Sequence, residues 1–256
     1  MYPCWYFWLL FALAMAVSSI GFKNYVWFIS LGYGFSIAAA GLLMLALFHD
    51  ALTLGTVLCC VIFFLYGCRL GGYLAYRELK SSSYKKNMTG EIKDGKTVPL
   101  WVKLAIWITC ALLYATQVSP VFYRLFNGAG SNVWVYIGAV VMVCGITLES
   151  AADIQKNRAK KINPRRFVDT GLYRIVRCPN YLGEMSFWAG AFLYYLPLYP
   201  EKWYCGLGFV SIIALFISVS VPMMEKHNAA RRTGWEEYKA KTSALFILPN
   251  RKKGEK

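Results

Sequence analysis

Long apolar runs alternate with short polar segments along this chain. Each run has a length of about 17–25 residues, which is what a helix needs to cross roughly 30 Å of hydrocarbon. We count seven runs, at about 4–21, 26–48, 51–74, 99–120, 132–152, 182–199 and 203–223. The gaps leave no room for a soluble domain. The pattern therefore predicts an all-α, polytopic membrane protein, in which residues 1–256 form one bundle of seven transmembrane helices.

The composition agrees with a membrane protein, since 57% of the residues are hydrophobic and 17% are aromatic. The net charge of +15 would suggest nucleic acid binding in a soluble protein, but here the basic residues report topology. Six Lys and Arg lie in 77–96, eight in 156–177 and nine in 226–256. Together with Lys23, these make 24 of the 28 Lys and Arg, and all of them are expected on one side of the membrane. Only Arg124 and Lys202 are expected in loops on the other side. The positive-inside rule then predicts an external or lumenal N-terminus and a cytosolic C-terminus.

The first apolar run is preceded by no basic residue, so we expect it to be a retained first span rather than a cleaved signal peptide. The host membrane is expected to be the endoplasmic reticulum in a eukaryote or the inner membrane in a bacterium. With no C-x-x-C pair and only two histidines, we expect neither a disulfide framework nor a metal site. We expect a monomer that contacts membrane lipids and no nucleic acid.

The third span carries an unusual polar face. Tyr66, Arg69, Tyr73 and Tyr76 follow a 3-4-3 spacing, which places them on one stripe of a helix. Tyrosines near a membrane surface are commonly interfacial anchors, and an arginine can extend its head group to the interface. Tyr66 lies deeper, near the middle of the membrane, and an intramembrane arginine usually faces the protein interior. We therefore favour a polar cavity at Tyr66 and Arg69.

Carboxylates and an amide flank the fifth and sixth spans. Glu149 and Asp153 are four residues apart where the fifth span ends, and Asn180 and Glu184 repeat that spacing where the sixth begins. Asn180 and Glu184 could simply cap a helix N-terminus. Glu149 fits such a role poorly, because a carboxylate near a helix C-terminus meets the unfavourable end of the macrodipole. Together the four acceptors could hold a ribose, a carboxamide or a cationic sulfonium.

A basic loop and tail adjoin these acceptors. The loop 153–180 and the tail 225–256 carry the basic side chains Lys156, Arg158, Lys160, Lys161, Arg165, Arg166, Arg174, Arg177, His227, Arg231 and Arg232. Such a set first determines topology and faces lipid head groups, but arginine also suits phosphate oxygens. Because neither a G-x-G-x-x-G nor a P-loop motif is present, any nucleotide must bind within a helical bundle.

Three motifs of the C-terminal half resemble the steroid 5-alpha-reductase family, and most closely a bacterial-type branch known as a domain of unknown function. They are Glu149-x-x-x-Asp153-x-Gln155-Lys156-x-x-x-Lys160, then Gly171-Leu172-Tyr173-x-x-x-Arg177-Cys178-Pro179-Asn180-Tyr181-Leu182-Gly183-Glu184, and the tail Trp235-Glu236-Glu237-Tyr238 running to Pro249. The resemblance covers about 149–249 well. The N-terminal half, up to about residue 125, matches only in its spans and in the pair Tyr66-x-x-Arg69.

This resemblance implies NADPH held in a seven-helix bundle and a lipophilic enone as substrate. It implies that Asp153, Asn180, Glu184 and His227 bind the nicotinamide-ribose and diphosphate portion, while Lys160 and Arg166 meet phosphates. Tyr66, with Arg69 beside it, would bind the substrate carbonyl oxygen. The cofactor set is completed by Glu149, Lys156, Tyr173, Arg177, Tyr181 and Arg231.

The chain departs from the family in two places. Cys178 stands where the branch usually has histidine, and the second span has no acid to partner Tyr66, offering only Tyr33 and Ser36. Two other functions therefore stay open. One is an S-adenosylmethionine-dependent methyltransferase of lipid or isoprenylcysteine type, whose Arg-His-Pro-x-Tyr-x-Gly signature is much like Arg177 to Gly183. The other is a non-catalytic protein that binds sterol or lipid.

Overall fold

The computed structural model describes residues 5–80, 98–164, 166–195 and 204–246, and its regular elements in these ranges are all helices. The only β-type pairing they contain is an isolated parallel bridge between Val176 and Ser243. The chain divides into two compact units. We call Met1–Ala139 with Ala191–Gly208 the N-terminal unit, and Val140–Gly190 with Phe209–Lys256 the C-terminal unit.

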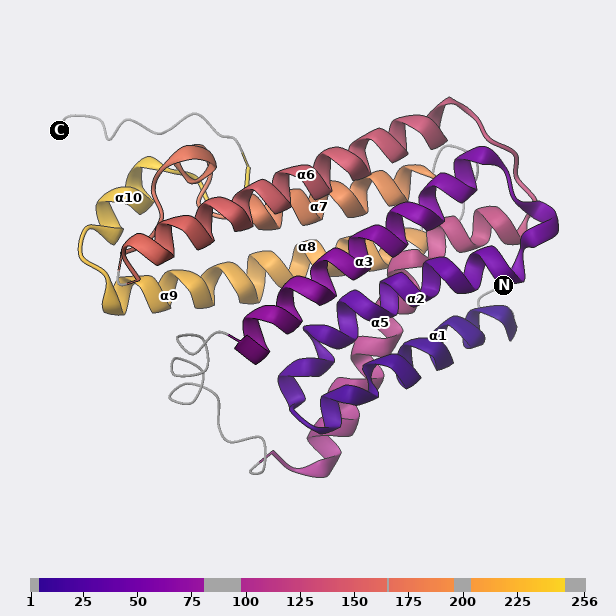
Figure 1. The fold of residues 1–256 in the computed structure, drawn as a ribbon, viewed down its shortest axis with the longest axis horizontal. Coiled ribbons are helices and arrows are strands. Elements are labelled where there is room, and N and C mark those ends of the chain that lie inside the picture. Colours follow the sequence, from indigo (N-terminus) through magenta and orange to yellow (C-terminus); the bar gives the residue numbers. More distant parts are fainter. Residues whose placement is uncertain (1–4, 81–97, 165, 196–203, 247–256) are drawn as a thin grey trace. The chain divides into compact units, whose positions relative to one another are not determined.

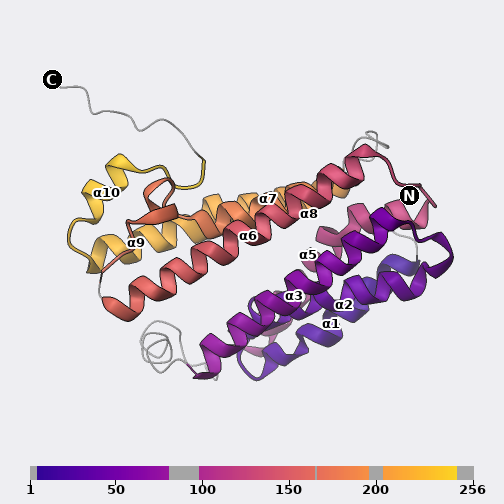
Figure 2. The ribbon, with the colours of Figure 1, turned by 45° about the horizontal axis from the view of Figure 1, so that its top comes forward.

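The N-terminal unit is built around four helices, α1 (Trp5–Ser18), α2 (Leu31–Leu47), α3 (Leu54–Lys80) and α5 (Leu100–Phe126). α2 lies between α1 and α3 (Figure 2). Glycines allow α2 and α3 to approach closely, because a Cβ at Gly34 would stand 2.5 Å from the Gly71 nitrogen and one at Gly67 only 2.3 Å from the Gly34 oxygen. Small residues at such crossings are typical of helices that pack within lipid.

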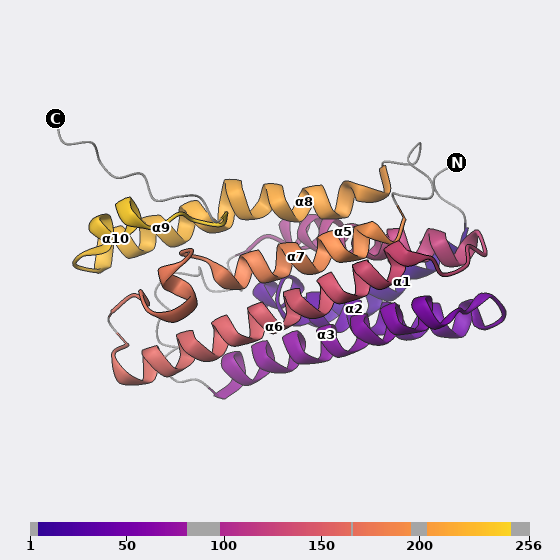
Figure 3. The same cartoon turned by 90° about the horizontal axis from the view of Figure 1, so that it is seen from above.

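The C-terminal unit contains most of α6 (Val133–Ile162) and α7 (Pro179–Leu193). They are followed by α8 (Leu207–Leu215), the π-helical turn η7 (Phe216–Ser220) and α9 (Val221–Arg231). α7 lies between α6 and the α8–α9 helix (Figure 3).

Glycine again sets the closest contact in the C-terminal unit. A Cβ at Gly183 on α7 would meet the Glu149 nitrogen of α6 at 2.6 Å, and one at Gly145 would meet the Gly183 oxygen at 2.6 Å. On its other side, α7 contacts η7 through the stacked rings of Tyr181 and Phe216, whose centroids are 4.5 Å apart.

The chain reverses direction after α9. The helix ends at Arg231, Arg232 is extended (φ −137°, ψ 117°), and Gly234 adopts the left-handed conformation with φ 78°. A short helix, α10 (Trp235–Lys241), then lies back beside α9 (Figure 1). Beyond α10 the backbone pairs with the loop before α7, since the Arg177 nitrogen donates to the Ser243 oxygen at 2.8 Å.

Six helical segments of the described residues are long and apolar enough to cross a membrane. They are Trp5–Phe22, Tyr25–Leu47, Leu54–Glu78, Leu100–Phe126, Val133–Ile162 and Tyr204–Arg231. The protein is therefore a multi-pass helical membrane protein. The predicted span 182–199 corresponds to α7, which has 15 residues, and residues 196–203 lie outside the described part of the chain.

Two helices run further than the apolar pattern indicates, and this corrects two expectations. We expected Arg124 in a loop, but it lies in the last turn of α5 with its side chain fully buried, donating hydrogen bonds to the carbonyl oxygens of Tyr194 and Gly130. We also placed Glu149 near a helix C-terminus, whereas α6 continues to Ile162. The unfavourable macrodipole therefore does not act on Glu149.

Candidate functional site

A cavity of about 250 Å³ lies in the C-terminal unit, between α6, the loop before α7, the first turn of α7, α9 and α10. Its charged lining residues are all basic, namely Lys156, Lys160, Arg177 and Arg232, and His227 lies among them. No Asp or Glu of the described residues lines it. A concave site of one charge sign attracts ligands of the opposite charge, so this cavity favours an anion.

The cavity brings together seven of the residues that the sequence predicts for a cofactor. They come from α6, the loop and first turn of α7, and α9, and they are Lys156, Lys160, Tyr173, Arg177, Asn180, Tyr181 and His227. The other five predicted cofactor residues are not part of its lining, and these are Glu149, Asp153, Arg166, Glu184 and Arg231.

The predicted acids continue the same helix faces away from the cavity. On α6, Glu149 and Asp153 precede Lys156 and Lys160 at a spacing of 4, 3 and 4 residues, so all four share one stripe of the helix. On α7, Glu184 lies one turn beyond Asn180. The Glu149 side chain is buried beside the α6–α7 crossing, with a relative exposure of 4%. A stripe of carboxylates therefore leads into the basic cavity.

Arg166 and Arg231 lie at the outside of the unit. Arg166 forms an exposed ion pair with Asp169, with 2.7 Å between Nη2 and Oδ2. Arg231 is exposed at the end of α9. Neither side chain reaches the cavity lining.

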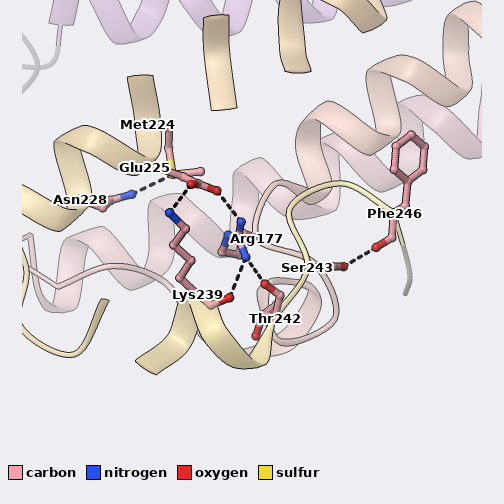
Figure 4. Close-up of polar contacts among 8 residues, drawn as sticks. All are labelled: Arg177, Met224, Glu225, Asn228, Lys239, Thr242, Ser243 and Phe246. Atoms are coloured by element: carbon pink, nitrogen blue, oxygen red, sulfur yellow. Dashed lines mark hydrogen bonds and ion pairs between the residues drawn. The ribbon is translucent and has the colours of Figure 1, made fainter. Parts of the chain in front are cut away.

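Both terminal nitrogens of Arg177 donate hydrogen bonds to other residues of the C-terminal unit. Its Nη1 donates to the backbone oxygens of Lys239 (3.0 Å) and Thr242, and its Nη2 donates to Glu225 (Figure 4). Glu225 is also paired with Lys239 at 2.7 Å between Oε2 and Nζ. We call Arg177, Glu225, Lys239 and the Thr242 carbonyl the Arg177 clasp. The clasp joins the loop before α7 to α9 and to α10.

Aromatic rings form the wall that α10 contributes. Phe167 stacks on Tyr238 with 5.0 Å between the ring centroids, and it meets Trp235 edge-on at 5.4 Å. The Tyr238 hydroxyl donates to the backbone oxygen of Tyr173. These contacts hold α10 against the loop that the Gly171–Arg177 motif provides.

The start of that motif is fixed by α6. The Gln155 Oε1 accepts a hydrogen bond from the Leu172 nitrogen at 2.9 Å. Gly171 has φ 60°, and a Cβ there would stand 2.4 Å from the same Gln155 oxygen. Glycine suits this turn because the backbone is left-handed there.

Two lining residues that the sequence-based site omits have buried donors with no partner among the described residues. They are Arg232, at Nε and Nη1, and Trp235, at Nε1. Burial, and then the neighbouring Arg231, lower the pKa of the Arg232 guanidinium. Such donors are costly to leave unpaired, so they favour an anionic acceptor in the cavity.

The predicted catalytic pair lies in the N-terminal unit. Tyr66 on α3 is fully buried, and its hydroxyl oxygen is 3.5 Å from that of Tyr33 on α2. The Arg69 guanidinium carbon is 5.7 Å from the centroid of the Tyr66 ring. Toward the end of α3, Tyr73 contacts Arg77 and Tyr76 is exposed, as interfacial anchors are. The residues around Tyr66 thus form a buried polar cluster.

Comparison with known proteins places the chain in a family. It belongs to the family described as "Protein of unknown function (DUF1295)", whose model matches residues 10–242. No curated protein and no solved structure matches the chain.

Proposed function

We propose that this protein is an NADPH-dependent membrane reductase, which reduces a carbon–carbon double bond conjugated to a carbonyl group in a lipophilic substrate, as the resemblance to steroid 5-alpha-reductases implies. The observation that carries the proposal is the basic cavity, whose lining has four Lys and Arg and no Asp or Glu among the described residues.

The charge of the cavity supports a dinucleotide phosphate over S-adenosylmethionine. Of the four basic side chains, Arg177 is paired with Glu225, and Lys156, Lys160 and Arg232 add further positive charge to the lining. A lining with this excess of positive charge suits a ligand that carries several phosphate charges. S-adenosylmethionine carries a sulfonium and an ammonium against a single carboxylate, so the same cations would repel it.

The size of the cavity supports the binding of only part of such a ligand. Small-molecule sites usually enclose ~300–1,000 Å³, and this cavity has about 250 Å³. We assign it to the phosphate and ribose portion. The stripe of Asp153, Glu149 and Glu184 along α6 and α7 then suits the carboxamide and the ribose hydroxyls of the nicotinamide end, because carboxylates accept hydrogen bonds from both.

The chain contributes a hydrogen-bond donor for the reaction at the substrate carbonyl. NADPH, if bound, would supply a hydride to the carbon β to the carbonyl group, and a proton from solvent would complete the saturated ketone at the α carbon. In this proposal the Tyr66 hydroxyl donates a hydrogen bond to the carbonyl oxygen, on which negative charge develops. Tyr33, with its hydroxyl oxygen 3.5 Å from that of Tyr66, and Arg69 beside the Tyr66 ring hold this phenol in place.

The proposal includes the topology that the basic residues predict. We infer seven spans, with α7 as the sixth, an external or lumenal N-terminus and a cytosolic C-terminus. Arg124 is buried in α5 rather than lying in a loop, so one basic residue fewer is left in the loops opposite the basic side. The difference in basic residues between the two sides is therefore larger than the hydropathy pattern alone indicates. The cavity then faces the cytosol, where NADPH is found, and the protein acts as a monomer among membrane lipids.

Turnover tests the proposal. The purified full-length protein, reconstituted in nanodiscs, is supplied with NADPH and a panel of lipophilic enones, and loss of the reduced-nicotinamide absorbance is followed. We expect oxidation of NADPH that depends on an enone and yields the saturated ketone. Transfer of a labelled methyl group from S-adenosylmethionine to lipid, without NADPH oxidation, would replace the reductase with a methyltransferase. Absence of both activities in a folded protein would support a lipid-binding role.

A further inference from the structure

The turn between α9 and α10 contributes two side chains with unpaired hydrogen-bond donors to the cavity wall. Trp235 is buried, with a relative exposure of 3%, and its Nε1 has no acceptor among the described residues. Nε and Nη1 of Arg232 are likewise buried without an acceptor in the described part of the chain. Both side chains line the cavity, and so does Lys160 of α6.

The local backbone explains how these two side chains come to line the cavity. Arg232 follows the last residue of α9 in an extended conformation, so its side chain leaves the helical face that carries Arg231. Gly234, in the left-handed conformation, then starts α10 with Trp235 as its first residue. The indole ring is held by Phe167 at 5.4 Å and by Tyr238 at 5.5 Å between centroids. The position of the Nε1 donor is therefore fixed by packing.

The three side chains have complementary chemistry. Lys160 and Arg232 bring positive charge, and Trp235 brings a neutral donor that can approach an oxygen without adding charge. A phosphate monoester presents three strong acceptor oxygens and up to two negative charges, which matches two cations and an additional N–H. A carboxylate offers only two oxygens and one charge.

We propose that Lys160, Arg232 and Trp235 form a subsite for a phosphoryl group. If the proposed function holds, this group is the 2′-phosphate monoester by which NADPH differs from NADH. The subsite then determines the choice between the two dinucleotides. A phospholipid head group such as that of phosphatidic acid offers the same chemistry, and the experiment separates the two sources.

Equilibrium binding to the purified full-length protein in nanodiscs tests the subsite, with NADPH, NADH and phosphatidic acid as probes. Arg232→Gln removes the guanidinium, and Trp235→Phe removes the Nε1 donor while keeping a ring against Phe167. Arg158→Gln is the matched control, because Arg158 is exposed on α6 and does not line the cavity. Melting temperatures establish that each variant is folded.

We expect Arg232→Gln to weaken NADPH binding about 10- to 100-fold and Trp235→Phe to weaken it about 3- to 10-fold. In both variants the affinity for NADH should change less than about twofold, and Arg158→Gln should leave both affinities unchanged. Equal losses for NADPH and NADH would overturn the subsite and leave the proposed function standing. If the protein binds neither dinucleotide but binds phosphatidic acid through Arg232, the subsite stands and the proposed function fails. Binding of none of the three probes would overturn both.

Discussion

The Arg177 clasp allows a local stability prediction that does not depend on the identity of the ligand. We consider Arg177→Gln, which keeps a polar side chain of moderate length but removes the positive charge and the fork of donors. In the wild-type chain this guanidinium is the common partner of Glu225, the Lys239 oxygen and the Thr242 oxygen. These acceptors lie on α9, on α10 and directly after α10.

The magnitude follows from the burial of the pair. The relative exposures of the Arg177 and Glu225 side chains are only 8% and 17%. Removing one partner of a buried ion pair costs about 3–5 kcal/mol. Glu225 keeps its contact with Lys239, whose side chain is 41% exposed, so we expect the lower value of about 3 kcal/mol. That energy corresponds to roughly a hundredfold increase in the population of molecules in which residues 235–246 are detached from the rest of the unit.

Hydrogen exchange measures this population directly. Amides of residues 235–246 in the purified protein are compared between wild type, Arg177→Gln and the control Arg174→Gln, whose exposed arginine lies in the same loop. We expect exchange in 235–246 to accelerate about a hundredfold in Arg177→Gln, with α2 and α3 unchanged as internal references. If Arg177→Gln and Arg174→Gln exchange alike in this segment, the clasp does not hold α10 and our reading of Arg177 is wrong.

Three further predictions concern other parts of the chain. Tyr66→Phe should lower enone turnover a hundredfold or more, since the loss of one hydrogen-bond donor to the carbonyl oxygen costs ~2.7–4 kcal/mol. The affinity for NADPH should stay the same, and undiminished turnover would remove Tyr66 from the mechanism. Gly183→Ala forces a Cβ to 2.6 Å from the Glu149 backbone and should destabilise the protein by about 1–3 kcal/mol in thermal melts. Gly72→Ala, where a Cβ meets nothing within 4 Å, should not, and equal melting of the two variants would contradict the close α6–α7 contact. Burial raises the pKa of the Cys178 thiol to about 12. At about pH 8 its thiolate fraction is therefore roughly a thousandfold below that of a cysteine with pKa about 8.5, and we expect slow labelling by maleimide. Fast labelling of Cys178 in the folded protein, read by mass spectrometry, would show that the thiol is accessible instead.

Helical periodicity was enough to predict much of the site. The spacing of Glu149, Asp153, Lys156 and Lys160 places them on one face of α6, and the two lysines of that stripe line the cavity. The end of α6 could not be read from hydropathy, because the helix continues for ten residues beyond 152 on polar sequence that suits water rather than lipid. Hydropathy reports where a membrane ends, and it carries no information about where the helix ends.

Contacts between distant segments account for what the sequence did not predict. The acceptors of Arg177 lie 48 to 65 residues away, so its basic character alone suggested a phosphate ligand. The predicted cofactor set contained Arg231 but neither Arg232 nor Trp235. Both residues follow the end of α9, where the extended backbone at Arg232 and the left-handed Gly234 break the helical periodicity. The 3.5 Å approach of Tyr33 to Tyr66 likewise depends on the α2–α3 register that Gly34 and Gly67 permit.

An equilibrium titration of the wild-type protein in nanodiscs with NADPH, and separately with S-adenosylmethionine, tests most directly whether the C-terminal unit binds a dinucleotide phosphate. We predict saturable NADPH binding that weakens as salt is raised, because the recognition relies on the cations of the cavity, and no saturable binding of S-adenosylmethionine. Saturable binding of S-adenosylmethionine with none of NADPH would contradict the account.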